Sequence, residues 1–192
     1  MTNNGSITGG NGGAGGTGWY GRYIGGNGGA GGAGVYLNGG ALTTAGTISG
    51  GAGGPGGKGP PNGSAGAAGD AVQFGTVAST LVVKPHAVFN GQVAANGSVN
   101  DVLKLSGNQS GGTPITLGTQ FTGFSTLTFA SGAAWTVDAG TGAAPSSGLA
   151  VNTFTTSDTL DVTNLTPTQV AADFNPSTDK LTTCLLYTSR CV

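Results

Sequence analysis

The sequence predicts an all-β fold, a β-solenoid with glycine-rich loops, and three observations support this prediction. A glycine-punctuated unit repeats within the first half of the chain. Short apolar runs alternate with polar residues through most of the remainder, and signals for helices are nearly absent. Self-similarity at a fixed period is typical of solenoids, in which each unit buries its apolar face against its neighbours.

The repeat is visible letter by letter. Residues 1–10 return in similar form as residues 42–51, and residues 9–16 return unchanged as residues 25–32. Stacked units would place equivalent side chains, of the Ile7 and Leu42 type, in internal ladders, with Asn and Thr hydrogen-bonding along the same stack. At ~20 residues per coil the chain would form roughly nine coils.

The strand signals have a period of two residues, which places one set of side chains inside and the other in water. A sandwich or a closed barrel would fit these short runs too, but the repetition favours a solenoid. One segment, residues 166–174, has the N-cap and proline of a short helix. The apolar pairs that define the strands are Val35/Leu37, Val72/Phe74, Leu103/Leu105, Ile115/Leu117, Leu127/Phe129, Trp135/Val137 and Leu160/Val162.

The glycine tracts allow two interpretations. A run such as residues 50–57 buries almost no side chain, and glycine loses the most backbone entropy on ordering, which favours flexible loops that leave the solenoid on one side. The alternative is a bundle of polyglycine-II helices with three residues per turn, for which residues 9–16 have the required Gly-Gly-X period. Loops are the preferred interpretation, because the tracts are few and interrupted by aromatic residues.

Composition narrows the class of partner. Charged residues are 7% of the chain against about 25% in typical globular domains, and the formal net charge is −1. Neither a nucleic acid nor an anionic membrane is therefore an expected partner. No motif predicts a cofactor or a metal site, and His86, the single histidine, is expected in an exposed turn.

Three segments are expected. Residues 1–69 hold the glycine-rich repeats, and residues 70–183 continue the solenoid up to a strand that begins near Asp179 and stops in mid-element. Residues 184–192 resemble the translation of the mosaic-end sequence that a transposase leaves in sequencing libraries, and are expected to be a non-native scar. Because both cysteines lie there, no disulfide is expected, and the chain is interpreted as a fragment of a longer protein.

Several short motifs suggest a family. Residues 39–50, 69–74, 100–107, 121–127 and 132–137 resemble the passenger region of bacterial autotransporters and related large surface adhesins. The resemblance implies a right-handed parallel β-helix that is exported to the bacterial cell surface or beyond it. The membrane connection of such proteins is a C-terminal β-barrel in the outer membrane, beyond these residues. Expected partners are glycans or proteins of host or neighbouring cells.

Three hypotheses for function follow. The first is an adhesin-like surface protein without catalysis, with Trp19, Tyr20 and Tyr23 as possible ligand contacts. Aromatic side chains outside a core can stack on sugars or partner surfaces. The alternative, that these residues fasten a glycine loop to the coil beneath, is the slightly preferred interpretation.

The other two hypotheses depend on residues that the sequence alone cannot bring together. A polysaccharide-acting β-helix enzyme would need several carboxylates in one groove, and its catalytic candidates are Asp101, Asp138, Asp158 and Asp161. A polyglycine-II receptor-binding tip, such as phage fibres use, would require the glycine tracts to form a bundle.

Overall fold

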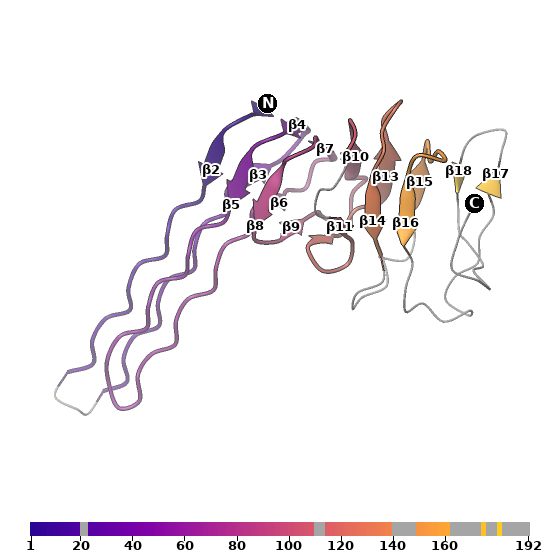
Figure 1. The fold of residues 1–192 in the computed structure, drawn as a ribbon. Helices are drawn as coiled ribbons and strands as arrows, with labels where there is room; N and C mark the ends of the chain where they lie inside the picture. The colour runs from indigo at the N-terminus through magenta and orange to yellow at the C-terminus, as the bar shows by residue number, and fades with distance from the viewer. Residues whose placement is uncertain (20–22, 110–113, 140–148, 162–173, 176–179, 182–192) are drawn as a thin grey trace.

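A computed structural model describes residues 1–19, 23–109, 114–139, 149–161, 174–175 and 180–181. These residues form strands and no helix, and almost all strand pairs are parallel (Figure 1). The all-β prediction is confirmed, with the parallel sheets of a β-solenoid. Apart from Phe174, the candidate helix at 166–174 lies outside the described residues.

The longest sheet, which we call the first sheet, contains one strand from each coil. Its order is β1-β4-β7-β10-β13-β15, all parallel, followed by the antiparallel strands β18 and β17. The expected last strand corresponds to β18. The bounds are Thr2–Asn3 for β1, Gly40–Thr44 for β4, Ser79–Val83 for β7, Val102–Leu105 for β10, Thr126–Phe129 for β13, Ala150–Asn152 for β15, Phe174–Asn175 for β17 and Lys180–Leu181 for β18.

Three shorter parallel sheets form the other walls of the solenoid. The second sheet contains β2 (Ser6–Thr8), β5 (Thr47–Ser49) and β8 (Val88–Asn90). The third sheet contains β3 (Val35–Leu37), β6 (Val72–Phe74), β9 (Val93–Ala94) and β12 (Phe121–Thr122). The fourth sheet contains β11 (Ile115–Thr116), β14 (Thr136–Asp138) and β16 (Thr159–Asp161).

The chain visits these sheets in turn, so each pass is one coil. Coil 1 comprises β1, β2 and β3, coil 2 comprises β4, β5 and β6, and coil 3 comprises β7, β8 and β9. Later coils begin at β10, β13 and β15.

The pairing register shows how much chain each coil uses. Thr2 pairs with Thr43 and Thr43 pairs with Val82, whereas Val82 pairs with Lys104 only 22 residues later. The first two coils are longer because the glycine tracts leave the solenoid between its second and third sheets. The estimate of nine coils is therefore wrong: the first sheet carries six parallel strands among the described residues.

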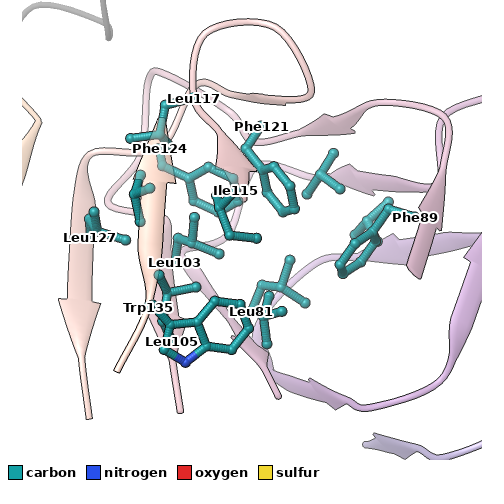
Figure 2. Close-up of a cluster of buried hydrophobic side chains, with 14 of the residues drawn as sticks. Leu81, Phe89, Leu103, Leu105, Ile115, Leu117, Phe121, Phe124, Leu127 and Trp135 are labelled. Atoms are coloured by element: carbon teal, nitrogen blue, oxygen red, sulfur yellow. The ribbon is translucent and has the colours of Figure 1, made fainter. Parts of the chain in front are cut away.

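Ladders of identical or similar apolar side chains fill the solenoid, as the repeat predicts. Leu42, Leu81, Leu103 and Leu127 are in register on successive strands, and each is 0% exposed. Figure 2 shows that Phe89 and Phe121 close the same cluster, with ring centroids 5.3 Å apart in an edge-to-face arrangement. Each such buried side chain contributes about 1.5–3 kcal/mol relative to an exposed one.

Polar ladders accompany the apolar ones. The Asn3 side-chain amide donates to Thr44 Oγ1 at 3.2 Å, between residues that face each other on β1 and β4. Asn90 Nδ2 likewise donates to Ser49 Oγ at 3.0 Å. The predicted hydrogen bonding of Asn and Thr along the stack is confirmed between coils 1 and 2, and an Asn–Ser bond joins coils 2 and 3.

The glycine tracts project from coils 1 and 2 as four extended segments that lie side by side (Figure 1). We call them tract 1 (residues 9–18), tract 2 (25–34), tract 3 (50–59) and tract 4 (63–70), and together the glycine bundle. Tracts 1 and 3 lead away from the strands, and tracts 2 and 4 return to them. In coil 3 the corresponding connection is only Gly91 and Gln92, with Gly91 at a φ of 121°.

Backbone hydrogen bonds at every third residue connect the tracts. Such bonds join every pair of tracts except tracts 1 and 4, which have none among the described residues. Tracts 1 and 4 therefore lie on opposite outer sides, with tracts 2 and 3 between them. Representative bonds are Gly12 N to Ala52 O (2.8 Å), Gly29 N to Gly13 O (2.8 Å), Gly54 N to Gly29 O (2.8 Å), Gly28 N to Ser64 O (2.9 Å) and Gly66 N to Gly54 O (2.8 Å).

A three-residue period with bonds to several neighbours is the pattern of polyglycine II. The expectation of flexible glycine-rich loops therefore does not describe these tracts, and the bundled alternative does. The entropy of a single tract favours disorder, and the hydrogen bonds that oppose it become available only when two coils place four tracts together.

Close backbone approach determines which positions must be glycine. A Cβ on Gly12 would collide with the carbonyl oxygen of Gly29, and a Cβ on Gly54 with that of Gly13. A Cβ on Gly13 itself would meet nothing within 4 Å. No tract glycine has a φ in the left-handed region, so the constraint is space rather than backbone conformation.

Replacing Leu103 by Ala should lower the free energy of unfolding by about 2–5 kcal/mol, because it leaves a cavity in the central ladder. Denaturant unfolding followed by circular dichroism measures the change. Lys104→Ala is the matched control, since Lys104 is the adjacent residue in β10 and does not belong to the buried core, and its effect should stay below about 1 kcal/mol. Equal losses in both variants would contradict the predicted core.

Gly12→Ala should disrupt the glycine bundle, whereas the neighbouring Gly13→Ala should be tolerated. Hydrogen exchange of tract amides reports the difference: Gly29 and Gly54, which donate within the bundle, should lose protection in Gly12→Ala only. Similar exchange in the two variants would mean that the tracts are not packed together in solution.

Candidate functional site

The outer tip of the glycine bundle is the candidate site. Tract 1 ends where Gly18 N donates to Lys58 O at 2.7 Å, which places Trp19 and Lys58 at the same level of the bundle. The described parts of the two connections between outgoing and returning tracts, residues 19, 23–24 and 60–62, meet at this end. It is the part of the bundle farthest from the sheets (Figure 1).

Backbone contacts join the two connections. Gly25 N donates to Pro61 O at 3.1 Å, so the base of one connection is bonded to the other. Gly59 N donates to Asn62 Oδ1 at 2.9 Å, which closes the turn between tracts 3 and 4. A Cβ on Gly59 would lie 2.6 Å from Tyr23 O, so this glycine allows the Tyr23 backbone to approach.

The tip exposes large apolar side chains. Trp19 is 73% exposed, Tyr23 is 66% exposed and Ile24 is 69% exposed. Tyr20, the third aromatic candidate, lies outside the described residues. The interpretation that these aromatics fasten a loop to the coil beneath is wrong for Trp19 and Tyr23, because the bundle carries them to its far end.

The charges near the tip have one sign. Residues 1–69 contain two charged side chains, Arg22 and Lys58, and no acidic residue. Lys58 is exposed beside Trp19, and Arg22 occurs in sequence between Trp19 and Tyr23, although its own placement is not described. The tip therefore combines aromatic surface with positive charge.

Sequence reasoning identified the aromatic residues of the tip but missed Ile24, Lys58 and Pro61. Their common signal is position, since each lies at or next to a boundary where the Gly-Gly-X period stops. That signal becomes informative only when the tracts are known to run side by side.

Two of the aspartates proposed for an enzyme have structural roles. Asp101 is 0% exposed, and its carboxylate accepts hydrogen bonds from Ser79 N at 2.8 Å and Asn96 N at 2.9 Å. Asp158 is 7% exposed and accepts from Trp135 N at 3.2 Å and from the Thr155 hydroxyl at 2.9 Å. Both carboxylates stabilise turns between coils, since buried donors require acceptors.

The other two aspartates are brought together. Asp138 and Asp161 are in register on β14 and β16, with Thr116 on β11 next to Asp138. Asp158 and Asp161 share the coil that begins at β15, whereas Asp138 lies on the coil before it. Neighbouring strands are only about 4.8 Å apart, so Asp138 and Asp161 are adjacent. A glycosidase could use such a pair, yet the other two candidates are engaged elsewhere.

Other candidate chemistry stays apart. His86 lies exposed in the turn between β7 and β8 with a φ of 70°, as expected for a turn. Within the described part of the chain, no three His, Cys, Asp or Glu residues are grouped closely enough to hold a metal ion.

Comparison of the chain with protein-family models, curated proteins and solved structures finds no match. The described residues contain no helix that is long and apolar enough to cross a membrane.

Proposed function

We propose that this chain is a non-catalytic binding protein whose β-solenoid and glycine bundle present an aromatic tip to a glycan on a cell surface. The observation that carries the proposal is the exposure of Trp19 and Tyr23 at the outer end of the bundle. This proposal joins the adhesin hypothesis with that of a polyglycine-II receptor-binding tip.

The bundle suits presentation. Ten residues of polyglycine II extend about 30 Å, and hydrogen bonds to several neighbours stiffen each tract along that length. A hydrophobic side chain at such a tip remains exposed because no core lies within reach. Exposed aromatic residues in a cluster indicate an interaction site more often than solitary ones do.

The composition of the tip favours an acidic glycan. Aromatic rings supply flat surfaces with both apolar and polar character, which suit sugar rings. Lys58 supplies positive charge, and residues 1–69 contain no carboxylate to neutralise it. Carboxylate or phosphate groups on a sugar would complement that charge.

Location and handedness belong to the same proposal. The resemblance to autotransporter passengers and surface adhesins supports export of a right-handed solenoid to the bacterial cell surface, where its partners would be host or neighbouring-cell glycans. The solenoid would then act as the support and the bundle as the arm that carries the tip.

A double variant, Trp19→Ala with Tyr23→Ala, should reduce binding to immobilised acidic glycans at least tenfold, because it removes the stacking surfaces. A printed array of acidic and neutral glycans measures this at low and high salt, and binding of the unmodified chain should weaken as salt rises.

The matched control is Tyr36→Ala. Tyr36 is 62% exposed but lies on β3 in the solenoid, so its removal should leave glycan binding unchanged. Equal loss in the control and the double variant, or no glycan binding by the unmodified chain, would count against the proposal.

A solenoid without the bundle should fold but not bind. Coil 3 links β8 to β9 through Gly91 and Gln92, so residues 9–34 and 50–71 can each be replaced by Gly-Gln. The shortened chain should retain the circular dichroism of β-structure and lose the array signal. Retained glycan binding would assign the site to the solenoid instead of the tip.

A further inference from the structure

The outward face of coil 1 carries glycines that nothing in the described structure requires. A Cβ on Gly5, Gly10, Gly13 or Gly16 would meet nothing within 4 Å, and none of these residues has a left-handed φ. Glycine at such positions costs conformational entropy on folding, and no close contact in the described structure requires it there.

The next coil shows what these glycines do when the face is covered. The register of β2 with β5 pairs Ile7 with Ile48, an offset of 41 residues. The same offset relates Gly5, Gly10, Gly13 and Gly16 to Gly46, Gly51, Gly54 and Gly57. A Cβ on any of the second set would collide with the carbonyl oxygen of its counterpart in the first set.

The backbone hydrogen bonds differ between the same two sets of glycines. Gly51, Gly54 and Gly57 donate their N–H groups to carbonyls of tract 2 at 2.8 Å. Their counterparts Gly10 and Gly13 have no acceptor for their N–H groups among the described residues. Coil 1 thus presents outward the surface with which coil 2 binds coil 1.

The opposite face of the bundle provides an internal control. Tract 2 corresponds to tract 4 with an offset of 37 residues, as the pairing of Val35 with Val72 shows. Coil 3 has no tracts, so nothing of this kind covers tract 4. At the positions of the tightly packed Gly25, Gly28 and Gly31, the second coil carries Asn62, which directly precedes tract 4, and Ala65 and Ala68 within it.

The repeat therefore loses glycine on the uncovered face next to coil 3 but keeps it on the outward face of coil 1. We propose that the outward face of coil 1 is the docking surface for a further coil of the same 41-residue glycine repeat within the same solenoid. Its outgoing tract would pack on tract 1 as tract 1 packs on tract 3. The inference is independent of any ligand at the tip.

The test adds such a coil. A copy of residues 1–41 fused directly before Met1 keeps the spacing, because Met1 then occupies the position that Leu42 has in the next coil. In the extended chain, the amides of Gly10, Gly13 and Gly16 should become at least tenfold more protected from hydrogen exchange than in the original chain.

A triple variant separates docking from mere attachment. Gly10→Ala, Gly13→Ala and Gly16→Ala together should change the melting temperature of the original chain by less than about 3 °C but lower that of the extended chain by about 5 °C or more. Ala14→Ser, at an exposed position of the same tract, is the matched control and should be neutral in both chains.

Two outcomes would overturn the proposal. One is an extended chain whose added coil stays unprotected or in which the triple variant has the same effect as in the original. The other is self-association of the original chain in light scattering that the triple variant abolishes, which would assign the face to a second copy. Neither outcome depends on glycan binding.

Discussion

Backbone hydrogen bonding between coils one repeat apart is the interaction on which the rest of the structure depends. The register that pairs Ile7 with Ile48 in the second sheet continues without interruption into the tracts, where Gly12 N donates to Ala52 O. Sheets and bundle thus share one stacking register, but different groups fill the space between their chain segments. In the solenoid, side chains such as Leu42 and Leu81 fill the space between walls. In the bundle, the backbone itself fills the space, so side chains must be absent.

This division explains how glycine is distributed among the tracts. Tract 3 contacts three other tracts, and a Cβ on either glycine of its Gly-Gly pairs would collide with a neighbouring backbone. Tract 4 lies on an outer side and needs glycine only at every third position, where Gly63, Gly66 and Gly69 approach tract 2. Its remaining positions are mostly Ala and Ser. In tracts 3 and 4 the number of glycines per turn follows the number of neighbouring tracts, whereas tract 1, which also lies on an outer side, keeps its Gly-Gly pairs.

The all-β class, the parallel stacking and the internal ladders could be predicted from sequence, because alternation and repetition are local signals. The number of coils could not, because ~20 residues per coil does not apply to the first two coils, in which residues 9–34 and 50–71 leave the solenoid. The state of the tracts was misjudged for a related reason. Each hydrogen bond contributes only about 0.5–1.5 kcal/mol, so a single tract predicts disorder and only the four together predict a bundle. The same limit applies to the tip. Trp19 is a candidate ligand contact by its residue type, but Lys58 comes to the same level only because tracts 1 and 3 pack side by side.

Register at the base also fixes what the tip presents. A one-residue slip of a polyglycine-II tract turns its side chains by 120°. In one direction the slip would move Asn11 and Ala14 into the spaces of Gly12 and Gly15, where a Cβ collides with tract 2. In the other direction it would move Trp19 into the space of Gly18, where a Cβ collides with Tyr23 O. A slip of three residues restores the glycines but shifts the tract by about 9 Å, which β2 and β5 cannot follow without breaking their own pairing. The bundle therefore has one register that satisfies both ends. In that register Gly18 meets Lys58, so the strands of the solenoid hold an aromatic and a cationic residue level with each other about 30 Å away.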